Sequence, residues 1–274
     1  MEKELFLKQL RPDIYLMDEA HEATGYIVVG EKKACVIDTM NGYNDLNKVV
    51  RSITDKPVIV INTHGHPDHI FGNMYFEEAY MNPKDNELAE MFIKEPEFVE
   101  MCNKNGRRMP EFKPIKGGDI VDLGGKTLMV YDLPGHTMGG IILLLKEERI
   151  LFTGDSVNHH LWMQLDGCLK MDEFVAELDK VMFLENEADV ILHGHAKDFD
   201  DISLMRCLRK GAMEICEGKT ENDPPYKWFG GVGRQHPYAL ENGKQYDQVA
   251  SVICYREQIQ LKVEFKFQIR QIGY

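Results

Sequence analysis

The amino-acid sequence predicts a mixed α/β (α+β) protein, a four-layer αββα sandwich in which two β-sheets pack face to face and helices cover the outer surfaces. Two observations predict this fold. Each half of the chain runs short β-rich segments first and a helix afterwards, the order expected when each sheet carries helices on one face. The 274 residues, 43% of them hydrophobic, are also enough to fill such a core.

The first half supplies one sheet. Gly25 and Gly30 separate β-rich segments. The expected strands are 14–17, 26–29 and 34–37, and a helix is expected over 45–53. The next segment, Val58–Ile61, is purely apolar, so we expect a strand that is buried on both faces.

The second half repeats the theme of strands followed by helices. The expected strands are 120–123, 127–133, 141–145, 150–152 and 190–192. The expected helices are 171–184, which is amphipathic, and 203–216. Between the halves, residues 82–118 are charged and include a predicted helix over 86–93, which makes this segment a candidate flap beside a site.

The composition changes near residue 219. We therefore expect residues 1–218 to form the sandwich domain and 219–274 to be a C-terminal extension, packed on that domain or on a partner subunit. Hydrophobic and polar residues alternate over 261–269, which predicts an edge strand with one apolar face. Such an edge is covered by its own chain or pairs with a second copy, so a homo-oligomer through this strand is a possible assembly.

Charge and segment composition narrow the function classes. The formal net charge of −13 disfavours nucleic acid and anionic membrane surfaces as partners. We find no secretory signal and no apolar run near the roughly 20 residues needed to cross a bilayer. The six cysteines are scattered, as in proteins with reduced thiols, so a cytoplasmic location is expected, with a small molecule as substrate.

Four metal-capable side chains follow the purely apolar strand within six residues, namely His64, His66, Asp68 and His69. Imidazole and carboxylate are ligands that Zn²⁺ favours. An i, i+2 pair in extended backbone lies on one side, so we expect His64 and His66 to bind one ion together. Asp68 and His69 lie beyond Pro67 and should face a neighbouring position.

Three further predicted strands also end in such residues. His136 follows strand 127–133, Asp155 follows strand 150–152, and His195 follows strand 190–192, each beside a glycine. Glycine lets the backbone approach an ion closely. Four strand ends that each present His or Asp indicate a metal site rather than packing.

With its HxHxDH motif followed by separated His, Asp and His, the chain resembles the metallo-β-lactamase-fold superfamily, in particular its hydroxyacylglutathione-hydrolase and lactonase branches. The resemblance covers roughly residues 10–216. It implies two divalent ions, zinc first, with iron or manganese as alternatives. One ion would be held by His64, His66 and His136 and the other by Asp68, His69 and His195, with Asp155 as the bridge. His193 is the second candidate for the last ligand.

This resemblance implies a metal-dependent hydrolase. A hydroxide bridging two ions about 3.5–4 Å apart would attack a small ester, thioester or lactone. Asp68 would be the catalytic carboxylate that orients the hydroxide or carries a proton. True β-lactamases lack a bridging Asp, so that activity is not expected. The diiron branch has Glu where this chain has His66, and no room remains for its flavodoxin domain.

Three alternatives stay open at this point. One is a phosphodiesterase or nuclease, which the net charge disfavours. The second is a persulfide dioxygenase with one iron at His64, His136 and Asp155. The third is metal binding without catalysis. The segment after Asp155 supplies possible substrate-pocket residues, namely His159, His160 and Trp162. Aromatic residues of the extension, Trp228 and Phe229 among them, are weaker candidates for the same pocket.

Overall fold

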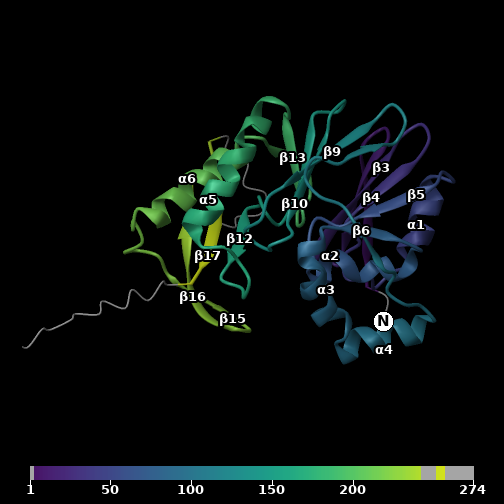
Figure 1. The fold of residues 1–274 in the computed structure, drawn as a ribbon, viewed down its shortest axis with the longest axis horizontal. Helices are drawn as coiled ribbons and strands as arrows, with labels where there is room; N and C mark the ends of the chain where they lie inside the picture. Colours follow the sequence, from purple (N-terminus) through teal and green to yellow (C-terminus); the bar gives the residue numbers. More distant parts are fainter. Residues whose placement is uncertain (1–2, 242–250, 257–274) are drawn as a thin grey trace, which may run out of the picture.

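The computed structural model describes residues 3–241 and 251–256, and it has the predicted four layers with a third, smaller sheet beside them (Figure 1). The first sheet contains seven strands in sequence order. They are β1 (Leu5–Arg11), β2 (Ile14–Glu19), β3 (Ala23–Val29), β4 (Ala34–Ile37), β5 (Val58–Ile61), β6 (Ala79–Met81) and β7 (Phe112–Pro114). Pairing is antiparallel from β1 to β4 and parallel from β4 to β7.

The second sheet contains six strands. In spatial order they are β14 (Asp200–Asp201), β13 (Val190–His193), β11 (Ile150–Gly154), β10 (Ile141–Leu145), β9 (Thr127–Asp132) and β8 (Ile120–Asp122). The first-half helices are α1 (Leu46–Ile53), α2 (Pro67–Ile70), α3 (Asn86–Ile93) and α4 (Pro96–Asn105), with the short 3₁₀ helices η1 (Phe71–Tyr75) and η2 (Pro83–Asp85). The second sheet carries α5 (Met171–Val181), η3 (Met182–Asn186) and α6 (Leu204–Cys216).

Strand β10 shows how the layers form. All five of its residues are buried because both faces of the strand are covered. Ile141, Leu143 and Leu145 face the first sheet and join the core between the two sheets. Ile142 and Leu144 face the other way and pack in the cluster formed with α5 and α6. A continuous apolar run is therefore what this central strand requires.

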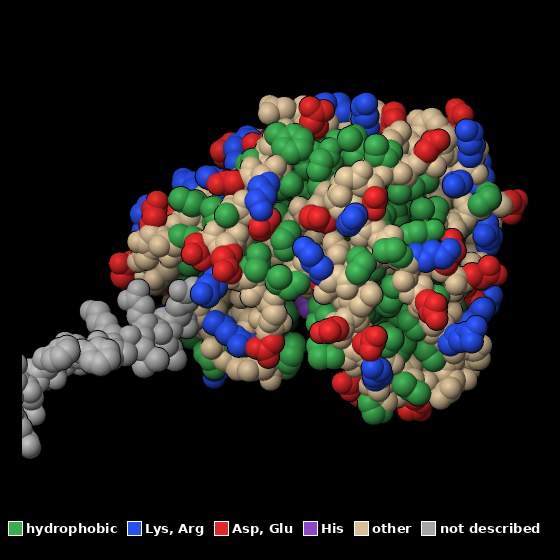
Figure 2. All heavy atoms as spheres, in the orientation of Figure 1, with side chains coloured by type: hydrophobic (Ala, Val, Ile, Leu, Met, Phe, Trp, Pro, Cys, Tyr) green, Lys and Arg blue, Asp and Glu red, His purple; other side chains and the backbone are tan. Residues whose placement is uncertain are grey.

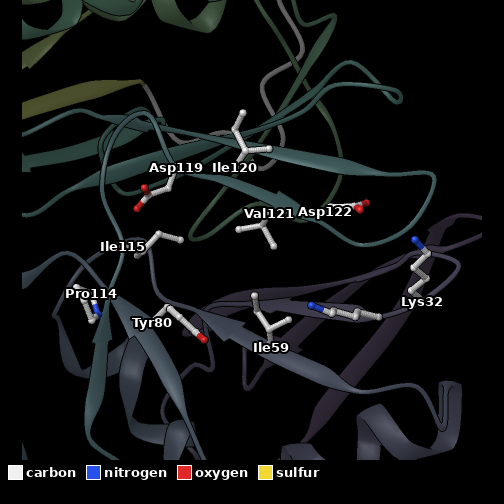
Figure 3. Close-up of a pocket in the computed structure, with 10 residues that line it drawn as sticks. Lys32, Ile59, Tyr80, Pro114, Ile115, Asp119, Ile120, Val121 and Asp122 are labelled. Carbon is white, nitrogen blue, oxygen red and sulfur yellow. The ribbon is translucent and has the colours of Figure 1, made fainter.

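The predicted elements largely agree with the structure, with two local differences. The helix expected over 171–184 ends as an α-helix at Val181 and continues as the 3₁₀ helix η3. Val58 and Ile59 are only half-buried, so β5 is not buried on both faces along its length. Ile59 lines an open groove of about 590 Å³ together with Tyr80 and residues of β8 (Figure 3). None of the predicted metal ligands lines this groove.

The third sheet joins the extension to the rest of the chain. Its order is β12 (His160–Met163), β17 (Val252–Tyr255), β16 (Gly231–Pro237) and β15 (Pro225–Trp228). Strand β17 pairs in parallel with β12, and Tyr238, Ile253 and Tyr255 enter the same core as α5 and α6. The alternating segment 261–269 lies outside the described residues. No helix within 3–241 and 251–256 is long and apolar enough to cross a membrane.

Candidate metal centre

Strand ends from both sheets meet at one place and bring the predicted ligands together. His64 and His66 follow β5, and His136 follows β9. His66 Nδ1 lies 3.1 Å from His64 Nε2 and 2.9 Å from His136 Nε2. These three nitrogens converge as the ligands of a single ion would, and we call them the first cluster.

A second cluster lies beside the first one. Asp68 and His69 belong to α2, and His195 follows β13. Asp68 Oδ2 is 3.5 Å from His69 Nε2 and 3.7 Å from His195 Nε2. Asp155, which follows β11, contacts both clusters. Its Oδ2 lies 3.1 Å from His195 Nε2 and 3.9 Å from His136 Nε2, and its Oδ1 lies 3.6 Å from His69 Nε2.

Hydrogen bonds on the far side of each ring decide which nitrogen faces the centre. His136 Nδ1 donates to the carbonyl of Trp162 at 2.6 Å, and His195 Nδ1 donates to the carbonyl of Glu22 at 2.9 Å. Each carbonyl can only accept, so Nδ1 carries a proton in both rings and Nε2 is the nitrogen that points into the site. Partners of this kind orient metal-binding histidines in proteins.

Asp38 fixes two more rings in the same way. Its Oδ2 lies 2.9 Å from His69 Nδ1 and accepts from the Thr63 hydroxyl at 2.7 Å, while its Oδ1 accepts from the Thr63 amide at 2.7 Å. The Thr63 oxygen can then accept from His64 Nδ1, which is 3.1 Å away. Asp38 itself adopts φ of +59°, a strained conformation for a non-glycine residue. This carboxylate therefore holds the backbone and two rings of the site.

Asp85 is a second carboxylate that holds the backbone of the site by hydrogen bonds. Its Oδ2 accepts from the Gly65 amide at 2.9 Å and from the Thr137 hydroxyl at 2.7 Å, and its Oδ1 accepts from the Gly139 amide at 2.6 Å. It thus ties the loop after β5 to the loop after β9. Burial raises the pKa of Asp85, and the three donors oppose that shift.

Two buried polar atoms of the centre lack partners, which bears on whether cations fit there. His69 Nε2 and Asp155 Oδ1 have no hydrogen-bond partner among the described residues. At 3.6 Å they are too far apart to bond each other. Leaving a buried nitrogen and a buried carboxylate oxygen without partners costs free energy, about 1–3 kcal/mol for each group. A cation between them would satisfy both, so the donor set fits divalent metal ions.

The two clusters differ in charge in the metal-free protein. Burial lowers the pKa of His64 well below its usual value and that of His66 to about 3. Both rings are therefore neutral at pH 7 and their lone pairs are free. In the second cluster burial also acts to lower the pKa, but the neighbouring carboxylates outweigh it. They raise the pKa of His69 well above its usual value and that of His195 to about 9.

The three predicted pocket residues separate into two groups. His160 and Trp162 lie on β12 and join Tyr226 and Phe229 of the extension in an aromatic cluster, which we call the aromatic rim. Its ring centroids are 5.5–6.4 Å apart. His159 instead bonds Asp200 and Ser251, and it lies in a third cluster with His193 and Asp200.

Sequence reasoning missed Asp38 and Asp85. Asp38 follows the buried strand β4 directly, and this position is the signal that could have found it. Asp85 carries no such signal, because it lies in a charged segment and its partners Thr137 and Gly139 are more than 50 residues away. His193, the second candidate for the last ligand, turns its Nε2 toward Asp200 rather than toward the clusters.

Comparison with known proteins identifies the family of the chain. Residues 21–195 match the model of the metallo-beta-lactamase superfamily. The acyl-coenzyme A thioesterase MBLAC2 of Gallus gallus is 26% identical over 215 residues, which cover 69% of this chain and 78% of that protein. A hydroxyacylglutathione hydrolase of Hyphomonas neptunium is 32% identical over 138 residues, covering 48% of this chain and 47% of the relative.

A solved structure shows the same fold. The crystal structure of a metallo-beta-lactamase family protein from Thermus thermophilus superimposes with a TM-score of 0.60 and 21% sequence identity, covering 80% of this chain and 86% of that one. The family match spans every strand end that carries a predicted ligand, from His64 to His195. The chain belongs to the metallo-beta-lactamase superfamily and is a hydrolase of that superfamily.

Proposed function

We propose that this protein hydrolyses small acyl thioesters and related esters or lactones with the help of two divalent metal ions. The observation that carries the proposal is the position of Asp155. Its carboxylate approaches His136 of the first cluster and both histidines of the second, so one residue serves two adjacent cation positions. The names of the two relatives support the substrate class, since an acyl-coenzyme A and an acylglutathione both carry an acyl group on a thiol.

The two clusters divide the ligands between the ions. His64, His66 and His136 would hold one ion, and Asp68, His69 and His195 the other, with Asp155 between them. Zinc suits such a set of imidazoles and carboxylates, and manganese or iron accepts the same donors. When bound, the ions supply Lewis acidity and make water nucleophilic at neutral pH.

Asp68 is the residue that we assign to proton transfer. Its side chain is about one-third exposed (32%), whereas that of Asp155 is largely buried. In the metal-free protein burial acts to raise the pKa of Asp68, but the charged rings of His69 and His195 outweigh it and hold that pKa at about 2. A bound cation would favour the ionised carboxylate in the same way. This carboxylate can accept a proton from the attacking water and pass it to the leaving sulfur or oxygen of the substrate.

The aromatic rim offers a surface for the acyl group. Trp162 lies beside the metal centre, because its carbonyl accepts from His136 Nδ1. Phe229 is 89% exposed although its ring is 6.4 Å from that of Trp162. Figure 2 shows a notch with a histidine at its base and hydrophobic side chains on both sides, between the β15–β16 hairpin and α3 of Figure 1. An exposed apolar surface at a polar site is where an apolar part of a ligand binds.

Metal analysis together with a substrate panel tests the proposal. We expect two equivalents of metal per chain, with turnover of acyl thioesters faster than that of bis(p-nitrophenyl) phosphate. His66→Ala should fold but lose activity. One equivalent of iron with oxygen uptake on glutathione persulfide would contradict the proposal, and so would cleavage of the phosphodiester in preference to every ester. Full activity of His66→Ala with normal metal content would also refute it.

The role of the rim is tested separately. Phe229→Ala should lower kcat/KM about 10-fold for an octanoyl thioester and leave that for an acetyl thioester unchanged, since roughly 1.5 kcal/mol of apolar contact would be lost. Val232→Ala is the matched control, because Val232 is 62% exposed on the same hairpin and pairs with Lys227, whose side chain points to the opposite face of β15 from that of Tyr226. Equal losses for both acyl lengths would show that the rim does not hold the acyl group.

A further inference from the structure

The third cluster is a buried hydrogen-bonded chain behind the metal centre. Asp200 lies between two imidazoles, with Oδ1 2.8 Å from His159 Nε2 and Oδ2 3.1 Å from His193 Nε2. The side chains of Asp200 and His193 are 7% and 6% exposed. At the far end His159 Nδ1 lies 2.9 Å from the hydroxyl of Ser251, which directly precedes β17. A carboxylate buried this deeply needs donors on both oxygens, and the two imidazoles supply them.

The direction of the hydrogen bonds in the third cluster follows from the backbone amide of His195. The amide N–H of His195 donates to His193 Nδ1 at 3.2 Å. That nitrogen therefore carries no proton, so the proton of the neutral His193 ring sits on Nε2 and is donated to Asp200. The chain thus runs from the hydroxyl of Ser251, through His159, Asp200 and His193, to the backbone of a proposed metal ligand.

The same direction argues against a third metal ion in this cluster. An ion on His193 Nε2 would require the ring proton to move to Nδ1. There it would face the amide N–H of His195, which is also a donor. Two donors cannot share one hydrogen bond, so the ring would have to give up its contact with the His195 backbone. The cluster is built for hydrogen bonding.

The backbone around His195 depends on this support together with a few other contacts. The carbonyl of His193 accepts from the Thr24 hydroxyl at 3.2 Å and from the Tyr26 hydroxyl at 2.5 Å. The next residue is held as well, since the Gly194 carbonyl accepts from the Thr24 amide at 2.8 Å and the Gly194 amide donates to the Gly154 carbonyl at 2.8 Å. The carbonyl of Glu22 holds the His195 ring, and the His193 ring accepts from the backbone amide of His195.

We infer that His193, Asp200 and His159 are positioning residues that hold His195 for the ion of the second cluster, and that Ser251 links this support to the C-terminal extension. The inference rests on the proposed function, because it takes His195 as a ligand. It assigns to the extension a part in metal affinity that is separate from any contact with substrate. Outer partners of this kind change metal affinity by about 10–100-fold when they are mutated.

The test uses Asp200→Asn in the full-length chain. An amide at this position has one acceptor oxygen and an NH₂ donor, so it cannot accept from both rings, and the ring that faces the NH₂ group, His159 or His193, must turn or change tautomer. We expect affinity for one of the two ions to fall about 10–100-fold, measured by competition with a chelator, while the other ion stays bound. Metal counted after dialysis should fall from two equivalents to one.

Asp223→Asn is the matched control. Asp223 and His236 form an equally buried pair in the extension, with His236 Nδ1 2.9 and 3.0 Å from the two carboxylate oxygens. No described contact joins this pair to His195. The control should therefore retain both ions even where its thermal midpoint falls as far as that of Asp200→Asn. Loss of one ion in both variants would show that general destabilisation, and not positioning, sets the affinity.

Wild-type protein and a milder variant complete the design. Suppose that wild type binds two ions and hydrolyses thioesters. An unchanged metal affinity of Asp200→Asn would then overturn the inference and leave the proposed function intact. Wild type without bound ions would refute the proposed function instead. Three ions in wild type and two in Asp200→Asn would also overturn the positioning role. If Asp200→Asn does not fold, Ser251→Ala replaces it in the test. We expect the affinity for one ion to fall, by less than the roughly 10-fold lower limit for Asp200→Asn, and an unchanged affinity would overturn the inference.

Discussion

Gly194 lies against the proposed ligands so closely that a single methyl group should disturb them. A Cβ at this position would stand 2.3 Å from Asp155 Oδ1 and 2.5 Å from His69 Cε1. Ordinary contacts begin near 3.4 Å, so both are about 1 Å too short. His69 is fully buried and its Nδ1 is held by Asp38, so the carboxylate of Asp155 must move instead. Gly194→Ala therefore displaces the residue that joins the two clusters.

The expected size of the effect follows from that displacement. A shift of about 1 Å in a catalytic group costs roughly 100-fold in rate, so kcat/KM should fall by that factor. Overpacking costs about 1–3 kcal/mol of stability, which lowers the thermal midpoint by about 2–4 °C per kcal/mol in a chain of this size. Metal content, measured by plasma mass spectrometry after dialysis, should fall below two equivalents per chain.

Gly106→Ala separates this effect from destabilisation alone. Gly106 caps α4 at φ of +61°, and a Cβ there meets no atom within 4 Å. Its conformational strain costs about 1 kcal/mol, within the range expected for Gly194→Ala, and touches no ligand. We expect two metal equivalents and wild-type kcat/KM. Two firmly bound ions and normal turnover in Gly194→Ala would refute the placement of Asp155 between the clusters.

Three further outcomes follow from the structure. Exhaustive chelation should lower the thermal midpoint, because ions present at about 1,000 times their Kd stabilise the fold by about 4 kcal/mol; an unchanged midpoint would contradict metal binding by the folded chain. Asp38→Asn should reduce metal content, measured as above, since the amide that replaces the carboxylate cannot accept all three of its bonds; normal content would refute the role of Asp38. In metal-free protein, Asp200 should contribute stability that is present above pH 4 and lost toward pH 2. Its folded pKa is about 2 against 3.8 in its ordinary state, which is worth about 2 kcal/mol. Urea unfolding of wild type and Asp200→Asn across this range should show a loss of stability about 2 kcal/mol larger in wild type, and parallel curves would exclude this contribution.

The fold and the convergence of the predicted ligand residues were predictable from the sequence because both depend on local patterns. Buried strands such as β10 and β5 are short apolar runs, and a ligand directly after such a run is carried to the same edge of the sandwich as the others. Asp38 also follows a strand directly, but its neighbours are Ile37 and Thr39, so it lacks the glycine that stands beside the predicted ligands at the other strand ends. The sequence alone shows where a strand ends, and in this fold the side chains of the proposed metal site lie at the ends of strands.

Other features depend on partners far along the chain, which no local pattern shows. β12 pairs with β17, about 90 residues later, so the segment around Trp162 carries no sign of its strand until that partner is known. The neighbours His159 and His160 look alike in the sequence, yet one bonds Asp200 and the other faces Tyr226. Their separation follows from extended backbone, in which successive side chains point to opposite sides.

The extension is joined to the metal centre by structure as well as by sequence order. Strand β17 pairs with β12, and the carbonyl of Trp162 on β12 accepts from the ring of His136. Ser251, one residue before β17, contacts His159 in the series of hydrogen bonds that ends at the backbone of His195. One proposed ligand of each cluster is thus supported by residues whose positions depend on a segment outside the 21–195 match to the superfamily. Because a ring that is free to turn binds an ion less tightly than one that is held, we expect the extension to contribute to metal affinity, although none of its described side chains belongs to either cluster.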